Sequence, residues 1–392
     1  MRKIFITSYP YVYDRYFRVF DFFKNKSNLI FILPKKWKTR AGFINPPQRD
    51  DIKIITTRAF FYGSKYPIVR GLLKGWMPAT GKILKKYAKP GDILFTAIEP
   101  NLLTTYMNSR LAKKLGMAHF FHTWQNIPYR SRLKGFKLKV TEWLIRKNVE
   151  MSTGVMCGTN KALEITKPYL NSEIKVAIIP QAGVDVNVFK PGLPSDFRER
   201  HNLNDKILFI FAAVFDERKG VFTTIEAFSK VLKSLPSGHL VMIGIGKLWD
   251  EAQMLVSDLD IKDHVMFIRW MPNNELASIF NTADVLVHPS EPYRDWEEQY
   301  GWTMLQASSS GLPVIATDIG SINEAVLDKK TGILIKPKNP KALAEAMLFL
   351  AQHPEVRKQM GMAGREHILN KFSHQSIANR MESFLNSYGK KN

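Results

Sequence analysis

The chain has 392 residues, which is too many for one hydrophobic core, so we expect two domains. Its 45% apolar and 23% charged content is that of a globular protein, and no apolar run reaches the roughly 20 residues that a membrane-spanning helix requires. Tyr9, Pro10 and Asp14 interrupt the N-terminal apolar run early, so we expect no secretory signal. The single cysteine, Cys157, excludes an internal disulfide and favours a reducing compartment such as the cytoplasm. Because it ends a predicted strand, we expect it to be a buried and inert thiol.

The net charge of +22 lies in one half of the chain. Residues 1–190 hold 34 Lys and Arg against 11 Asp and Glu, whereas residues 191–392 hold 23 against 24. Such a basic half attracts an anionic partner, which is a membrane surface, an acidic glycan or nucleic acid. Nucleic acid is the weakest of these candidates, because the sequence contains no known nucleic-acid-binding motif.

In the first half of the chain, short apolar strands alternate with helical patterns, which predicts a parallel, doubly wound sheet. A basic loop with one aromatic residue is expected at 34–40. The expected strands are 3–8, 29–33, 52–56, 92–96 and 119–122, and the expected helices are 16–23, 66–87 and 101–115.

A basic segment follows the last of these strands. Seven cations between Arg130 and Lys147 are interleaved with apolar residues that include Phe136 and Trp143. A solvated surface helix is the simpler interpretation of this pattern. The charge imbalance adds weight to a second one, in which the helix lies on an anionic membrane with its aromatic side chains among the headgroups.

The second half repeats the alternation of strands and helices after a turn at 176–191. The expected strands are 207–213, 239–246, 265–268, 283–290, 312–317 and 331–335. The expected helices are 193–204, 274–281, one beginning at 303, 322–327, 339–352, 356–372 and an amphipathic tail at 376–388.

The stretch 297–326 joins a carboxylate, a glycine turn and a helix start. Glu298 to Gly301 shows no periodicity, and the helical pattern then runs from Thr303 to Gly311. The free N–H groups and the positive dipole end at such a helix start suit phosphate. Glu298, just before it, is better placed to accept hydrogen bonds from the hydroxyls of a sugar.

This stretch resembles the signature of glycosyltransferase family 4, the retaining enzymes of the GT-B fold. The family pattern is Glu, any residue, an aromatic residue, Gly, four further residues and a second Glu. Here it reads Glu298-Gln299-Tyr300-Gly301, with Gln306 in the place of the second acid. The resemblance implies that Glu298 contacts the transferred sugar and Gln306 the nucleotide ribose, which an amide bonds less strongly than a carboxylate.

Other residues between 176 and 372 match the family in chain order. Lys219 matches a cation that meets the diphosphate, and Val214 stands where the family usually has a second cation, an Arg. Arg218 is a candidate to supply that charge, although a surface charge in a loop explains it equally well. Arg269 and Met271 take the place that contacts the nucleotide base. The remaining donor-site residues that the resemblance implies are Tyr300, Gly301, Trp302 and Thr303.

The resemblance also assigns a histidine of the first domain to the donor sugar. His122 ends the strand at 119–122 and matches that place better than His119, although a lone histidine at a strand end is more often structural. No group of His, Cys and acidic residues has metal-ligand spacing, and the pair Asp258 and Asp260 lies in a helix-like segment. We therefore expect no metal and no cofactor.

Together these observations predict an α/β protein of the GT-B fold, with two Rossmann-like domains facing a cleft. The expected domains are 1–188 on the acceptor side, 189–372 on the nucleotide-sugar side, and a returning helix at 373–392. The reaction implied by the resemblance moves a sugar, with retention, from a nucleotide diphosphate sugar to a glycan or lipid-linked acceptor. The implied catalytic residues are Glu298, His122 and Lys219, and the expected location is the inner face of an anionic membrane.

Two other functions stay open from the sequence. One is a GT-B nucleotide-sugar epimerase, which would need no acceptor and would release free products. The other is a non-catalytic binder of anionic polymers, which the basic half and the departures at Val214 and Gln306 support.

Overall fold

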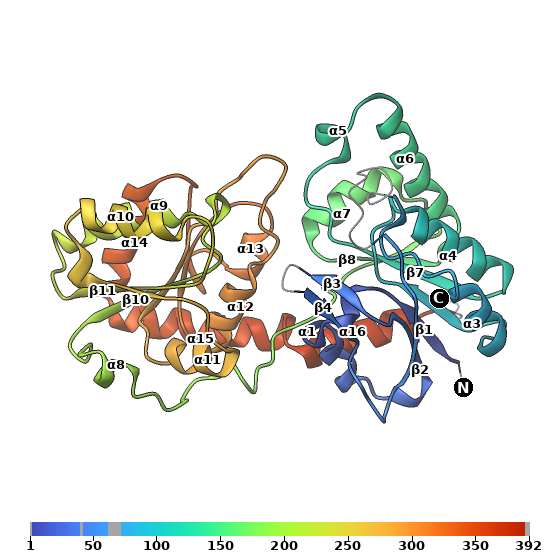
Figure 1. The fold of residues 1–392 in the computed structure, drawn as a ribbon, viewed down its shortest axis with the longest axis horizontal. Helices are drawn as coiled ribbons and strands as arrows, with labels where there is room; N and C mark the ends of the chain where they lie inside the picture. Colours follow the sequence, from blue (N-terminus) through green and yellow to red (C-terminus); the bar gives the residue numbers. More distant parts are fainter. Residues whose placement is uncertain (1, 40–41, 62–71, 389–392) are drawn as a thin grey trace. The chain divides into compact units, whose positions relative to one another are not determined.

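The computed structural model describes residues 2–39, 42–61 and 72–388. The chain divides into two compact units: unit 1 comprises Met1–Gly183 with His374–Asn392, and unit 2 comprises Val184–Ser373. Each unit is built on one large parallel sheet with helices on both faces (Figure 1). The predicted α/β class with two doubly wound sheets is therefore confirmed.

Unit 1 has its first strand in the middle of its sheet. The chain moves outward from β1 to β2 and β5, then returns past β1 and adds β6 to β9 on the other side. Parallel strands buried on both faces read as continuous apolar runs, as Leu29–Pro34 does. Among the described residues the order is β5 (Lys53–Thr57), β2 (Leu29–Pro34), β1 (Ile4–Thr7), β6 (Ile93–Thr96), β7 (Ala118–Thr123), β8 (Gly154–Cys157) and β9 (Lys175–Ile178).

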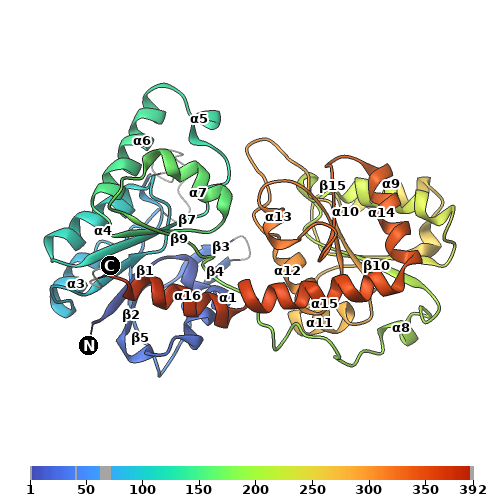
Figure 2. The same ribbon diagram turned by 180° about the vertical axis from the view of Figure 1, so that it is seen from behind.

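Alternate residues of each strand enter opposite layers of this unit. Ile4 and Ile6 pack in a core that α16 closes, whereas Phe5 packs against α3 and α4 on the other face. The helix α16 thus completes the core of unit 1 although it is the last element of the chain (Figure 2). In the described residues the helices are α1 (Asp14–Phe17), α3 (Thr80–Tyr87), α4 (Leu103–Lys114), α5 (Tyr129–Arg132), α6 (Gly135–Glu150), α7 (Asn160–Thr166) and α16 (His374–Asn386).

Unit 2 repeats the doubly wound plan, with its first strand, β10, again inside the sheet. In the described residues the order is β12 (Val265–Ile268), β11 (Gly238–Ile243), β10 (Ile207–Ala212), β13 (Val285–His288), β14 (Val314–Thr317) and β15 (Gly332–Ile335). Its helices are α8 (Phe197–Arg200), α9 (Val221–Leu232), α10 (Trp249–Asp258), α11 (Asn273–Phe280), α12 (Trp302–Ser309), α13 (Ile322–Ala325), α14 (Pro340–Gln352) and α15 (Pro354–Lys371).

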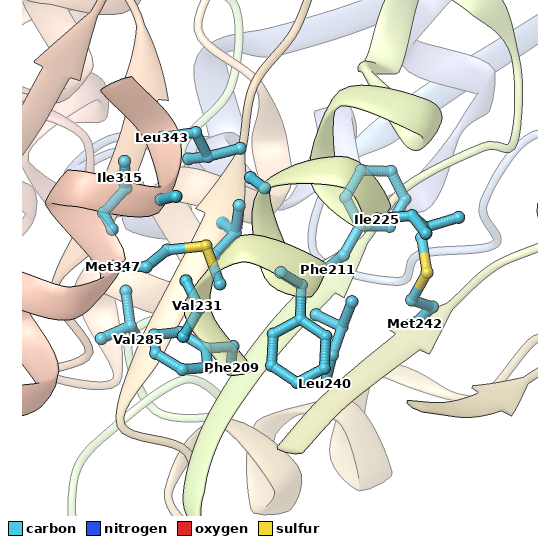
Figure 3. Close-up of a cluster of buried hydrophobic side chains, with 14 of the residues drawn as sticks. Phe209, Phe211, Ile225, Val231, Leu240, Met242, Val285, Ile315, Leu343 and Met347 are labelled. Carbon is cyan, nitrogen blue, oxygen red and sulfur yellow. The ribbon is translucent and has the colours of Figure 1, made fainter. Parts of the chain in front are cut away.

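The main core of unit 2 lies between the sheet and the helices α9 and α14. Phe209 and Phe211 of β10 meet Ile225 of α9 there, and Leu343 and Met347 come from α14 (Figure 3). All of these side chains are completely buried. This rigid layer fixes the carboxyl ends of β10 and β13, from which the candidate site is built. None of the described helices combines the length and the apolar content of a membrane span.

Cys157 and the amphipathic tail follow the prediction. The thiol is fully buried at the end of β8, and burial raises its pKa to about 12, so it is inert at neutral pH. The tail forms α16 and buries Ile377, Met381 and Leu385.

Several predicted elements are wrong in kind or length. The helix expected at 16–23 is broken into the single turn of α1 (Asp14–Phe17) and a 3-10 helix at Arg18–Phe22, and Phe17, Val19 and Phe20 are all fully buried. The loop expected at 34–40 contains the strand β3 (Trp37–Thr39), which pairs with β4 (Gly42–Ile44). The helix expected at 322–327 is limited to α13. Of the helix expected at 66–87, residues 66–71 lie outside the described residues, and only α3 is a long helix in the remainder.

The polar helix expected at 193–204 is reduced to the four residues of α8. Arg198 explains this difference, because its guanidinium donates to the carbonyl oxygens of Leu203, Lys206 and Thr282. It also forms an ion pair with Asp284 at 2.8 Å. These bonds hold the segment as a compact loop, which amphipathic periodicity alone does not reveal.

We predict that Gly361→Ala destabilises unit 2. A Cβ at Gly361 in α15 would lie 2.0 Å from the carbonyl oxygen of Gly311. Because that oxygen belongs to the backbone, the clash could be relieved only by shifting the packed helices α12 and α15. Overpacking of this kind costs about 1–3 kcal/mol. Thermal unfolding followed by circular dichroism should show a lower midpoint.

Gly364→Ala in the same helix is the matched control. Its Cβ would meet Ser308 Cβ at 3.4 Å, an ordinary contact, and alanine has the higher helix propensity by about 1 kcal/mol. We expect this variant to be at least as stable as the wild type. Equal midpoints for the two variants would contradict the close packing of α15 on the turn after α12.

Candidate functional site

Glu298 lies in the loop between β13 and α12, at the carboxyl edge of the second sheet, and is 8% exposed. Its Oε2 forms an ion pair with Lys219 Nζ from the loop after β10. The same oxygen accepts a hydrogen bond from Ser290 Oγ at 3.1 Å and lies 3.5 Å from His288 Nε2. Ends of two neighbouring strands thus converge on one carboxylate.

This environment keeps Glu298 ionised. Burial alone raises the pKa of its carboxyl, but the hydrogen bond from His288 and the charge of Lys219 outweigh burial and lower the pKa to about 2. Burial lowers the pKa of His288, so its imidazole is neutral and donates from Nε2. At neutral pH the centre therefore holds one carboxylate, one ammonium and one neutral imidazole.

Two glycines let the backbone close around Glu298. Gly301 has a φ of +63°, and a Cβ there would lie 2.4 Å from Met304 Cε and 3.3 Å from His288 Nε2. Gly320 has a φ of +61°, and a Cβ there would lie 1.8 Å from the carbonyl oxygen of Glu298. That carbonyl accepts the N–H of Ser321 at 3.2 Å. The loop of Glu298 is thus fixed from both sides by backbone contacts that only glycine permits.

The amino ends of two helices flank this centre. Lys219 is followed by Gly220, the N-cap of α9, and Glu298 is followed by Gly301, the N-cap of α12. The first N–H groups of a helix have no acceptor within the helix, and the dipole makes this end positive. Together with Lys219, these two helix ends form an electropositive setting that suits a diphosphate.

An aromatic side chain from the segment 292–296, which the family resemblance predicts to be an insertion, lies beside the cations. Trp296 lies under the Arg218 guanidinium at 4.7 Å and the Lys219 ammonium at 5.1 Å from its ring centroid. Tyr293 and Trp296 exchange backbone hydrogen bonds of 3.3 and 3.1 Å, which close the insertion into a tight turn. Arg218 also forms an ion pair with Asp216. Arg218 therefore belongs to the surroundings of Lys219 and does not contact Glu298 directly.

The other residues expected around the donor lie further out. Arg269 and Met271 follow β12, which is separated from β13 by β11 and β10, and the Arg269 guanidinium lies 4.9 Å from the centroid of Trp249. Tyr300 is buried against Phe372, with ring centroids 4.9 Å apart.

Trp302, Thr303 and Gln306 lie in α12, all half-buried. Within the described part of the chain, no protein group hydrogen-bonds the Gln306 side chain. Its amide is therefore not committed to holding the fold together.

His122 lies in unit 1, at the carboxyl half of β7. It is 1% exposed, and its Nε2 bonds the carbonyl oxygen of Ile179 at 2.9 Å. Burial lowers the pKa of the imidazole to about 3, so it is neutral. Its Nδ1 is buried and has no hydrogen-bond partner among the described residues. The contact of His122 with a donor sugar stays a prediction.

Sequence reasoning missed His288 and Ser290. They lie at the end of β13, in the run His288-Pro289-Ser290, and ligand sites of open α/β sheets lie at the carboxyl ends of strands, so that rule could have identified them. Trp296 belongs to the segment 292–296, which the family resemblance predicts to be an insertion that could shape the donor pocket. In the described residues no group of three or more His, Cys, Asp and Glu could hold a metal ion.

Comparisons with known proteins agree with this geometry. The family model described as glycosyl transferases group 1 matches residues 195–367. The chain is 30% identical over 207 residues to a GDP-mannose-dependent alpha-(1-6)-phosphatidylinositol monomannoside mannosyltransferase of Mycolicibacterium smegmatis, covering 52% of this chain and 54% of that protein. It is 28% identical over 231 residues to a D-inositol 3-phosphate glycosyltransferase of Corynebacterium diphtheriae, covering 56% and 52%. These matches span about half the length of the curated relatives.

Solved structures match the chain over its whole length. The Anabaena protein HepE in complex with UDP has a TM-score of 0.74 at 15% identity, covering 99% of this chain and 100% of that one. Sucrose-phosphate synthase of Thermosynechococcus elongatus has a TM-score of 0.71 at 18% identity, with 99% of each chain covered. At sequence identities this low, the similarity shows a shared fold and no more. Residues 195–367 therefore match the glycosyl transferases group 1 family, and the chain has the GT-B fold of two Rossmann-like units.

Proposed function

We propose that the protein is a retaining glycosyltransferase that moves a sugar from a nucleotide diphosphate sugar to a glycan or lipid-linked acceptor. The observation that carries this proposal is the buried ion pair of Glu298 and Lys219 between the amino ends of α9 and α12. Two relatives support the proposal. One is a GDP-mannose-dependent mannosyltransferase of phosphatidylinositol monomannoside, and the other is a D-inositol 3-phosphate glycosyltransferase. HepE supports a diphosphate ligand, because it was solved with UDP.

Lys219 and the helix ends hold the diphosphate in this proposal. As the bond to the sugar breaks, negative charge grows on the departing diphosphate, and fixed donors aimed at that charge lower the barrier. Lys219 then shares its protons between Glu298 and the diphosphate. Trp296 positions the ammonium by lying against it, since a cation over an indole ring is held by the quadrupole of the ring.

Glu298 acts as an ionised acceptor of hydrogen bonds. A carboxyl group with a pKa of about 2 carries no proton at neutral pH, so it does not act as a general acid. It accepts hydrogen bonds from sugar hydroxyls and so orients the anomeric carbon. Gln306 lies one helical turn after the start of α12, and in this proposal its amide hydrogen-bonds the ribose of the nucleotide. Arg269 and Met271 contact the nucleotide base.

Among the routes to retention, a double displacement is disfavoured by the way nearby acids are engaged. A double displacement needs a second carboxylate beside the sugar as nucleophile. Glu291 accepts a hydrogen bond from Thr223, and Glu324 accepts one from Tyr300. Both acids are thus bonded to other side chains. This supports attack on the same face as departure, with the leaving phosphate taking the proton of the acceptor.

We also infer a membrane location, which the surface of α5 and α6 supports. Phe136 is 80% exposed and Trp143 is 46% exposed, and cations lie around them on the same two helices. Leu133 and Leu138 pack inward against Tyr129 and Ile145, so the apolar residues of this segment divide between a core and an outer face. Exposed aromatics among cations fit an anionic bilayer surface, and docking there concentrates the enzyme at a lipid-linked acceptor.

We predict that Glu298→Gln lowers sugar transfer by about 10²-fold or more, because it removes a charged hydrogen bond that strengthens in the transition state. Labelled nucleotide sugars with different bases and sugars serve as donors, and free nucleotide and transferred sugar are measured. Nucleotide binding, measured by calorimetry, should be retained, which shows that the variant is folded.

Glu345→Gln is the control for this change, because Glu345 is an exposed acid on α14 in the same unit. It should transfer sugar at the wild-type rate. Full activity of Glu298→Gln would remove Glu298 from the site. If the wild type turns over none of the donors, the proposed function itself fails.

We also predict salt-dependent binding to anionic vesicles. Each cation near an anionic surface adds about 1 kcal/mol, and the screening length falls to about 3 Å at 1 M salt, so binding should be lost at high salt. Sedimentation with and without anionic lipid measures it. Replacing Arg130, Arg132, Lys134, Lys137 and Lys139 together by Gln should release the protein while donor hydrolysis stays unchanged.

The control variant removes the same charge from unit 2, by replacing the exposed residues Lys230, Lys233, Lys330, Lys341 and Lys358. It should still bind the vesicles. Equal release of both variants would show a non-specific charge effect and contradict docking through α5 and α6. Tight RNA binding without vesicle binding would favour the polymer-binding alternative.

A further inference from the structure

An acid of unit 1, Glu99, lies at the carboxyl edge of its sheet and has no part in the site around Glu298. It follows β6, and β6 pairs with β1, the first strand of the unit. From β1 the chain moves outward to β2 and β5 and then returns to continue with β6, so the strand order reverses between β1 and β6. In open α/β sheets, ligands bind in the crevice at such a reversal.

Glu99 is the counterpart of Glu298 in the plan of the two units. In unit 2 the strand order reverses between β10 and β13, and Glu298 lies in the loop after β13. In unit 1 the strand in the same place is β6, and Glu99 lies in the loop after it. The two acids differ in their partners. Glu298 is paired with Lys219, whereas Glu99 forms no ion pair within the described part of the chain.

Two neutral donors hold the Glu99 carboxylate. The Thr123 hydroxyl donates to Oε2 and the backbone N–H of Trp124 to Oε1, each at 2.7 Å. The main chain of Glu99 is fixed as well, because its carbonyl oxygen accepts the Thr105 hydroxyl at 2.7 Å. A carboxylate can accept about four hydrogen bonds. Its remaining positions have no donor among the described residues, and Glu99 is only partly buried, so they are left for a ligand.

The charge of Glu99 is costly without such a ligand. Burial raises the pKa of its carboxyl, and the hydrogen bonds from Trp124 and Thr123, with the charges of Arg132 and Lys74, only reduce this effect. A purely structural link between the ends of β6 and β7 needs no charge, because neutral acceptors also hold a hydroxyl and an N–H. A carboxylate has an advantage where it binds hydroxyl groups, since hydrogen bonds to an ionised acceptor are stronger.

We propose that Glu99 positions the acceptor by accepting a hydrogen bond from a hydroxyl group of its sugar or polyol. This inference rests on the proposed function, in which the residues around Glu298 hold the donor. A hydroxyl can donate to a carboxylate, whereas a phosphate or carboxylate of the acceptor would be repelled by it. The end of the acceptor that enters unit 1 is therefore an uncharged sugar or polyol, and any phosphate that the acceptor carries lies away from Glu99.

The test compares transfer to added acceptors with hydrolysis of the donor by water. The probes are methyl α-mannoside, methyl α-glucoside, myo-inositol and glycerol, and release of free nucleotide is measured with a nucleotide sugar that the wild type turns over. At least one probe should accelerate release by the wild type. Glu99→Gln should lower the kcat/KM for that probe by about tenfold or more, as expected for a lost hydrogen bond to a charged group. Release without a probe, and the affinity for nucleotide, should stay at the wild-type values.

Glu164→Gln is the control, because Glu164 is an exposed acid on α7 in the same unit. It should respond to the probes as the wild type does. Thermal unfolding adds a readout of any structural role. Residues that bind substrate are often not optimal for stability, so Glu99→Gln should unfold at or above the wild-type midpoint. A structural link instead predicts a lower midpoint, with transfer and hydrolysis reduced in the same proportion, and that result would overturn the proposal.

The remaining outcomes separate this inference from the proposed function. A probe response of Glu99→Gln equal to that of the wild type overturns the role of Glu99. If the wild type releases nucleotide but none of the four probes accelerates the release, binding of an acceptor hydroxyl in unit 1 fails, while the donor chemistry of unit 2 stands. If the wild type releases nucleotide from no donor at all, the proposed function fails, and the role of Glu99 fails with it.

Discussion

The candidate site of unit 2 depends on one buried ion pair, that of Lys219 with Glu298. A charge taken out of water needs a partner of opposite sign and further hydrogen bonds, and removing one member leaves the other buried and uncompensated. Ser290 and His288 supply those further bonds to Glu298. The low pKa of Glu298 means that the pair stabilises the fold above the ordinary pKa of a glutamate. This contribution is lost as the pH falls towards 2, where the carboxylate becomes protonated.

The pair also explains the architecture around it. β10 brings Lys219 to the carboxyl edge of the sheet, and β13 brings His288 and Ser290 there, because these strands are neighbours. The glycines at 301 and 320 then allow the loop of Glu298 to lie against the ends of two helices. A site that must hold a diphosphate and a sugar needs a cation, N–H donors and an acceptor within reach of one another. The parallel sheet places all three without a metal ligand set in the described residues.

Much of this arrangement could be predicted from the sequence, because local patterns specify it. The run from Glu298 to Gln306 marks the loop and the helix start, and the apolar strands mark two parallel sheets. The elements that were predicted wrongly depend on contacts between residues distant in the chain. Arg198 holds its own segment as a loop by reaching Thr282, and Phe17 and Phe20 are buried by neighbours distant in the chain. The roles of His122, Gln306, Arg269 and Met271 stay predictions, because they require a bound donor.

Unit 1 contributes a different physical property, which is concentrated positive charge. The exposed aromatics on α6 lie among cations and suit an anionic surface, whereas unit 2 has nearly balanced charge. Under the proposed function, this division gives donor chemistry to one unit and attraction to an anionic partner to the other. A polymer-binding protein would need the basic half but would have no use for a buried Lys–Glu pair at two helix ends.

The central claim is that Lys219 and the helix ends around Glu298 bind a nucleoside diphosphate. Calorimetric titration of UDP, GDP and ADP into the wild type and into a Lys219→Met, Glu298→Gln double variant, which leaves no unpaired buried charge, tests it most directly. The account predicts that at least one diphosphate binds the wild type more tightly than its monophosphate does, and that the double variant loses this preference. A wild type that binds none of the three, or a double variant that keeps the preference, would contradict it.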